Sequence, residues 1–131
     1  MNRLWIAVTA MSFLLSVPVA RAQFGEPTHY DAASVTALTD QVQSDLNQAY
    51  RTWHFSNGDR GRLNHAEKEL REFARTWQNY HFNKGELDDA ISSIQHVLDN
   101  NRLNPGSRDA LSEDVSRLRN MREAYDHHEI R

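Results

Sequence analysis

Residues Phe55–Leu70 read FSNGDRGRLNHAEKEL, a stretch that fits either a calcium-binding loop or the start of a helix. It has the central glycine, the following apolar residue and the closing glutamate of a twelve-position calcium loop. The first, third and fifth ligand positions, however, would be Ser56, Gly58 and Arg60, where the loop needs Asp or Asn oxygens. Because Arg60 would also bring a positive charge close to the cation, we expect no calcium site here.

The same letters agree with the start of a helix. Asn57 and Gly58 form a turn dipeptide, and Asp59 is a candidate N-cap. Glu67 and Glu69 follow early in the segment, where the helix dipole favours negative charge. We therefore expect a helix to begin at about Asp59.

Apolar residues recur every three or four positions in four stretches of the chain, which is the pattern of amphipathic helices. No stretch alternates with a period of two, so the sequence predicts no strand. The connections are short, which favours antiparallel packing of consecutive helices. The predicted fold is all-α, a small antiparallel four-helix bundle with helices at about 31–54, 59–81, 84–100 and 107–127. The stripes are Val35, Leu38, Val42, Leu46, Ala49 and Trp53; Leu63, Ala66, Leu70, Phe73, Trp77 and Tyr80; Leu87, Ile91, Ile94 and Leu98; and Leu111, Val115, Leu118 and Tyr125.

Two further junctions carry helix-boundary signals. Asn83 is a candidate N-cap, and Glu86 stands three residues later, the spacing of a capping box. The segment 104–107, NPGS, is expected to place Pro and Gly between the third and fourth helices.

The first 22 residues have the pattern of a secretory signal peptide. Arg3 supplies a positive charge, residues 4–17 are mostly apolar, and Ala20 and Ala22 are small residues before a cleavage site between Ala22 and Gln23. The apolar run is shorter than the ~20 residues that a spanning helix needs, although an uncleaved anchor is the alternative. The expected organisation is a signal peptide at 1–22, a flexible N-terminal arm at 23–30 and a four-helix domain at 31–131.

The composition of the mature chain restricts its partners and its compartment. Cleavage would remove Arg3 and Arg21 but no acidic residue, leaving 13 basic and 18 acidic side chains and a net charge of −5. This charge argues against nucleic acid as a partner. The chain has no cysteine, which for an exported domain favours a bacterial periplasm or medium. No second long apolar stretch follows the leader, so we expect a soluble mature protein without a membrane span.

Histidine is the residue type that could bind a metal in this chain. In an up-down-up-down bundle, the ends of the second and fourth helices share a pole with the start of the first. Imidazole and carboxylate ligands at this pole could bind Zn²⁺, Cu²⁺ or Ni²⁺. The other interpretation is that the helix dipole alone favours histidine near a helix C-terminus. The candidate ligands are His29, His81, His127 and His128, with Asp31, Asp126 and Glu129 nearby.

The C-terminal sequence RNMREAYDHHEIR, residues 119–131, resembles the last helix of the cytochrome b562 family, periplasmic four-helix bundles that bind haem. The resemblance implies a histidine ligand near Asp126 or His127. The sequence VTALTDQV resembles the stretch that carries the family's methionine ligand, but this chain has Val35 at that place, and its only methionine after cleavage is Met121. The residues that match the last helix are Arg122, Ala124 and Tyr125.

A second resemblance concerns LTDQ, residues 38–41, which is similar to the Leu-Thr-x-x-Gln repeat of the all-helical envelope stress chaperones. It implies a chaperone role as a further alternative.

No residue pattern in the chain is typical of catalysis. The serines have no nucleophile motif or positioned base, and the aromatic residues Trp53, Phe73, Trp77 and Tyr125 are expected to form core rather than a ligand cage. We therefore expect a secreted or periplasmic protein that is not an enzyme, needs no cofactor, and acts by binding or as an accessory to another envelope protein.

Overall fold

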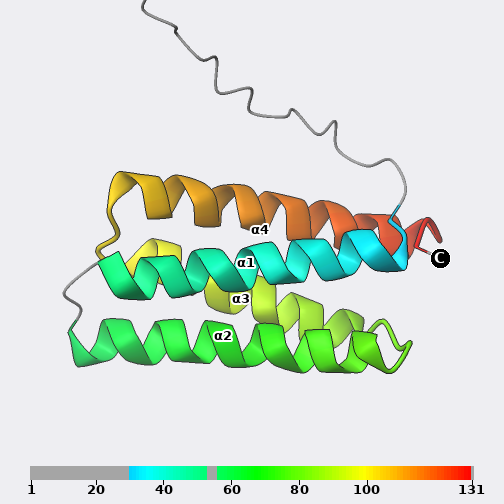
Figure 1. Cartoon of the computed structure of the whole chain (residues 1–131), viewed down its shortest axis with the longest axis horizontal. Helices are drawn as coiled ribbons and strands as arrows, with labels where there is room; N and C mark the ends of the chain where they lie inside the picture. The colour runs from blue at the N-terminus through cyan, green and yellow to red at the C-terminus, as the bar shows by residue number, and fades with distance from the viewer. Residues whose placement is uncertain (1–29, 53–55, 131) are drawn as a thin grey trace, which may run out of the picture.

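The computed structural model describes residues 30–52 and 56–130, which form an all-helical domain (Figure 1). No strand occurs within these ranges, and the one β-type contact there is an isolated parallel bridge between Tyr30 and Ile130. The predicted all-α class and the four helices are confirmed. The predicted signal peptide with its cleavage site, His29 and Trp53 lie outside the described residues. The helices are α1 (Ala32–Thr52), α2 (Asn57–Gln78), α3 (Lys84–Asn100) and α4 (Pro105–Asp126).

The four helices form a ring in which each packs against two others. Figure 1 shows that consecutive helices run in opposite directions. α1 packs against α2 and α4, and α3 packs against the same two helices. In the described part of the chain, no Cα atoms of the diagonal pairs α1–α3 and α2–α4 lie within 8 Å of each other. None of these four helices is both long enough and apolar enough to cross a membrane.

The core consists of the apolar stripes that face the centre of this ring. Aromatic rings collect at the end of the bundle where α2 stops, and there Trp77 and Tyr125 remain partly exposed. Tyr80 differs from the prediction, because it lies beyond the end of α2 and its side chain is 96 % exposed. The largest fully buried side chains are Val35, Val42 and Leu46 of α1; Leu63, Leu70 and Phe73 of α2; Leu87, Ile94 and Val97 of α3; and Leu111, Leu118 and Met121 of α4.

The opening stretch forms a helix from Asn57 onward, as the sequence predicts, but the cap is one turn earlier than expected. Ser56 is the N-cap, and its hydroxyl accepts from the Asp59 N–H at 3.2 Å. The Asp59 carboxylate accepts in return from the Ser56 N–H at 3.2 Å, which completes a capping box. Asp59 is therefore the third residue of α2 and not its cap.

Asparagine caps the other two helix starts in the second half of the chain. Asn83 accepts from the Glu86 N–H at 3.2 Å, as predicted, and Asn104 accepts from the Ser107 N–H at 2.8 Å. Pro105 and Gly106 belong to the first turn of α4 and not to a loop before it. The fixed backbone angle of proline and its missing N–H suit the first helical position, which explains the difference.

One end of the bundle is closed by a polar network around Asn101, which follows α3 and is buried. The Asn101 side-chain amide donates to the Asp59 carbonyl at 3.0 Å, and Arg62 Nε donates to Asn101 Oδ1 at 2.6 Å. Arg108 donates to the carbonyls of Leu98 and Asn101, at 2.7 and 3.2 Å. This network ties the start of α2 to the connection between α3 and α4.

Candidate functional site

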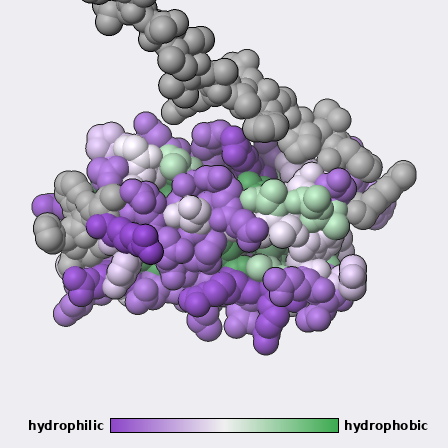
Figure 2. Space-filling model, viewed as in Figure 1, coloured by the Kyte–Doolittle hydropathy of each residue, from purple (hydrophilic) through white to green (hydrophobic). Residues whose placement is uncertain are grey.

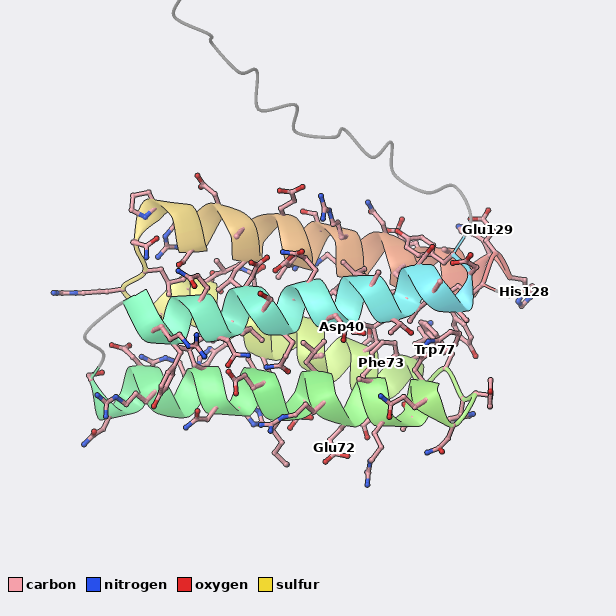
Figure 3. All side chains as sticks on the ribbon, viewed as in Figure 1. Asp40, Glu72, Phe73, Trp77, His128 and Glu129 are labelled. Carbon is pink, nitrogen blue, oxygen red and sulfur yellow. The ribbon has the colours of Figure 1, made fainter. Side chains whose placement is uncertain are left out.

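The opposite end of the bundle carries a groove with a volume of about 560 Å³, which we call the aromatic groove. The N-terminal part of α1, the end of α2 and the C-terminal segment all border it. In Figure 2 apolar surface is visible towards this end, whereas most of that face is hydrophilic. Figure 3 shows Trp77 between α1 and the last turn of α2. The lining residues are Ala32, Thr36, Trp77, Gln78, Tyr80, His81, Phe82, Tyr125 and Ile130.

Phe82 forms the centre of the aromatic cluster below the groove. Its ring meets those of Phe73 and Trp77 edge to face, with centroids 5.3 and 6.0 Å apart. On its other side it stacks on Tyr125, with centroids 4.2 Å apart and planes 14° from parallel. Edge-to-face and stacked pairs are the arrangements that aromatic quadrupoles favour. The floor of the groove is therefore well packed, while Trp77 and Tyr125 keep part of their surface exposed.

The turn after α2 places these rings. The His81 N–H donates to the Thr76 carbonyl at 3.0 Å, and the Tyr80 N–H donates to the Trp77 carbonyl at 2.8 Å. These two bonds form a Schellman motif, in which the residue directly after the C-cap adopts a left-handed backbone conformation. Here that residue is Tyr80, with φ of 58°. The reversal brings Phe82 back onto the end of α2.

The end of α4 repeats this motif at the same end of the bundle. Glu129 N–H donates to the Ala124 carbonyl at 2.8 Å, His128 N–H donates to the Tyr125 carbonyl at 3.0 Å, and His128 has φ of 60°. In this way Ile130 reaches the groove and the bridge with Tyr30. Glycine is the usual residue at such positions, so Tyr80 and His128 store strain beside the groove.

Charged side chains lie around the groove, whereas its lining among the described residues contains one histidine, His81, and no Asp, Glu, Lys or Arg. Lys84 Nζ lies 2.6 Å from Asp126 Oδ1, and Arg122 bonds Asp126 at 3.1 Å and Asp88 at 2.5 Å. The hydrogen bond from Lys84 lowers the pKa of Asp126 below its usual value. These ion pairs join the start of α3 to the end of α4, and they leave the groove suited to an uncharged ligand.

The histidines predicted as metal ligands are exposed where the structure describes them. His81 lies in the turn after α2 and does not close that helix, His127 is the C-cap of α4, and His128 follows it. Figure 3 shows His128 and Glu129 projecting beyond the end of α4. In the described residues, His81, His127 and His128 do not join any group of three metal-ligating side chains. With His29 outside these residues, the proposed histidine site stays a prediction.

Three carboxylates that the sequence did not single out do converge, between α2 and α3. Ligand oxygens of Glu69, Glu86 and Asp89 lie within 4.8 Å of one another, and this is the one such group in the described residues. His65 Nδ1 lies 3.5 Å from Glu69 Oε1, and Lys68 Nζ lies 3.7 Å from the same oxygen. Carboxylate oxygens suit hard divalent cations, and the Lys68 ammonium already neutralises part of the charge here. The three-residue spacing of Glu86 and Asp89 and the packing of consecutive helices could be predicted from the sequence, but the register that brings Glu69 to these two residues could not.

The positions implied by the haem resemblance lie in different surroundings. Val35 and Met121 are buried in the core, and His127 is exposed at the end of α4. Comparisons of the chain with protein-family models, with curated proteins and with solved structures gave no match.

Proposed function

We propose that this chain is an exported binding protein, without enzymatic activity, whose aromatic groove takes an uncharged apolar ligand with an aromatic ring. The volume of the groove, about 560 Å³, is within the range of small-molecule sites. Four of the nine lining residues are Trp, Tyr or Phe, while Gln78 and His81 can form hydrogen bonds that orient the ligand. The leader sequence supports the export, and the absence of cysteine supports a bacterial envelope or medium.

The observation that carries this proposal is the exposure and backbone conformation of Tyr80. Its side chain is 96 % exposed and lines the groove, and its backbone has the left-handed conformation that glycine would adopt without strain. Folding gains almost no burial from this ring, so stability alone does not explain a tyrosine here. A ring held at the rim of an aromatic groove can instead close over a bound ligand, and that contact would offset the strain.

The proposal is tested by filling the groove without removing any part of the core. Ala32 is exposed and lines the groove, so Ala32→Trp places a large side chain in the ligand volume. Ala37 is an exposed alanine of the same helix that does not line the groove, and Ala37→Trp is the matched control. The probe is N-phenyl-1-naphthylamine, an uncharged aromatic dye that fluoresces in apolar surroundings.

We expect the wild-type protein and Ala37→Trp to bind the dye with the same Kd. We expect Ala32→Trp to bind it at least tenfold more weakly, with an unchanged far-UV circular dichroism spectrum. Equal binding by all three proteins, or no binding to the wild type, would refute the groove as the ligand site.

A further inference from the structure

A second unusual feature lies between α1 and α4, away from the aromatic groove. Asp114 occupies a core position of α4 with only 2 % of its surface exposed. Its neighbours along the inner face of the helix are Leu111, Val115 and Leu118, all buried. Among the described residues, Asp114 Oδ2 is the one buried side-chain oxygen or nitrogen without a hydrogen-bond partner. A charged carboxylate in such a place is costly unless it is paired or protonated.

The group that faces Asp114 is another carboxyl. Asp45 of α1 is half-buried and lies within hydrogen-bonding reach of Asp114. Gln41 Nε2 donates a hydrogen bond to Asp45 Oδ2 at 2.9 Å. Two carboxyls this close can form a hydrogen bond only when one of them carries a proton. Burial, together with the Asp45 carboxyl, raises the pKa of Asp114 to about 8.

In the described part of the chain, no other charged group near Asp114 supplies the positive charge that would stabilise its carboxylate without a proton. On α4 itself, Arg117 favours the charged form and Glu113 opposes it, and these two side chains pair with each other. α3 is the other helix packed on α4. Two of its charged residues, Lys84 and Asp88, form ion pairs with α4, but their partners Asp126 and Arg122 lie two or more turns beyond Asp114. Its other charged residues, Glu86, Asp89 and Asp99, are all acidic and are not among the groups that shift the pKa of Asp114. No cation from a facing helix is among the groups that shift the pKa of Asp114, whereas the Asp45 carboxyl of the facing helix α1 raises it.

We propose that Asp45 and Asp114 share one proton and so form a proton-dependent clasp between α1 and α4, which weakens when that proton is lost to solvent. With the proton present, one neutral and one charged carboxyl form a strong hydrogen bond across the helix interface. Without it, two negative charges face each other in a site from which water is largely excluded. The clasp therefore couples the packing of α1 on α4 to the pH of the compartment.

The sign of the effect follows from proton linkage. In the unfolded chain Asp114 loses its proton near pH 4, and in the folded chain it does so at about pH 8. The stability due to the bound proton is complete below about pH 4, declines as the pH rises, and is lost above about pH 8. Across that window the unfolding equilibrium constant should rise by up to about tenfold per pH unit from this group alone.

The test compares urea unfolding of the wild type and Asp114→Asn between pH 5 and pH 9. An asparagine amide can donate to Asp45 at every pH, so the variant should lack this dependence. Relative to Asp114→Asn, the unfolding constant of the wild type should rise at least 100-fold between pH 5 and pH 8. Asp109→Asn is the matched control, because Asp109 is an exposed residue of the same helix. The ratio of the unfolding constants of the wild type and Asp109→Asn should stay the same from pH 5 to pH 8. Parallel curves for the wild type and Asp114→Asn would overturn the proposal.

A second measurement does not depend on the folding of any variant. Carbon-13 NMR of the wild-type carboxyl groups should show the side chain of Asp114 titrating well above pH 6 in the folded protein. A midpoint near pH 4 would overturn the clasp.

Discussion

Tyr80 and His128 share a backbone position that L-residues rarely occupy. Both follow a helix C-cap, both have positive φ, and both stand at the end of the bundle that holds the aromatic groove. The left-handed conformation costs a non-glycine residue about 1 kcal/mol or more, because its Cβ crowds the following carbonyl. At two separate helix ends the chain thus has a bulky side chain where glycine would be the more stable choice.

Replacing Tyr80 with glycine should therefore stabilise the protein while weakening its binding. We expect Tyr80→Gly to raise the free energy of unfolding by about 1 kcal/mol, since it relieves strain and removes a ring with almost no buried surface. Binding of N-phenyl-1-naphthylamine should weaken in the same variant. Tyr50→Gly is the control, because Tyr50 is an exposed tyrosine inside α1 where glycine should cost about 1 kcal/mol. A Tyr80→Gly variant that unfolds more easily than the wild type would contradict the prediction.

Asn101 differs from Tyr80, because its side chain is buried and both its amide nitrogen and its amide oxygen form hydrogen bonds. Asn101→Ala would remove the hydrogen bond from the Asn101 side chain to the Asp59 carbonyl and would leave Arg62 Nε without its acceptor, and we expect the free energy of unfolding to fall by about 2 kcal/mol. The neighbouring Asn100 is exposed, and its side chain forms hydrogen bonds with His96 of its own helix. Asn100→Ala should cost less than about 0.5 kcal/mol. Equal losses in the two variants would show that the network around Asn101 contributes little.

At the scale of single elements, the beginning of α2 depends on a capping box. Ser56→Ala removes the acceptor for the Asp59 N–H, and we expect it to destabilise the protein by about 1 kcal/mol. The same substitution at Ser92, an exposed serine inside α3, should be neutral or slightly stabilising because alanine is the better helix former. Urea unfolding of both variants at one pH provides the measurement. If Ser56→Ala were neutral as well, Asn57–Asp59 would need another explanation for their helical start.

The sequence predicted the existence of each helix better than its ends. The third helix has the predicted bounds, because Asn83 is a strong cap next to a regular stripe. The second ends three residues before the predicted position: the apolar spacing continues to Tyr80, but the chain has already turned. The fourth begins earlier than predicted. Pro105 was expected in the connection before the helix, but proline also suits the first helical turn, and Pro105 lies there. In both places the local sequence was compatible with a helix and with a loop, and the surrounding structure determined which of the two formed.

At the scale of the whole molecule, the periodic stripes were enough to predict the core and the helical class. They could not predict the contacts made between helices. Asp114 lies beside Glu113 in the sequence and resembles a surface residue, and its burial and its contact with Asp45 follow only from the packing of α1 on α4. Phe82 lies between the predicted helices and was therefore missed, although it is the centre of the aromatic cluster. The sequence predicted that consecutive helices pack together, but it did not predict the register and rotation of the helices that bring particular side chains into contact.

The two ends of the bundle also differ in how they are closed. Hydrogen bonds around Asn101 close one end, while the other is closed by Phe82 under a groove that remains accessible. Replacing an apolar residue should therefore affect binding at one end only. The residues to compare are Phe82, which lines the groove, and Leu103, which is half-buried and packs on the core from the connection between α3 and α4.

We expect Phe82→Ala to lower the free energy of unfolding by about 3 kcal/mol, because it removes the ring that contacts Phe73, Trp77 and Tyr125. The dye should then bind at least tenfold more weakly, since Trp77 and Tyr125 lose the ring that holds them in place. Leu103→Ala should cost about 1–2 kcal/mol and leave dye binding unchanged, since a half-buried leucine loses less than a core leucine. Urea unfolding and dye titration of both variants measure the two effects separately. Loss of dye binding in both variants alike would mean that the dye reports general stability and not the aromatic groove.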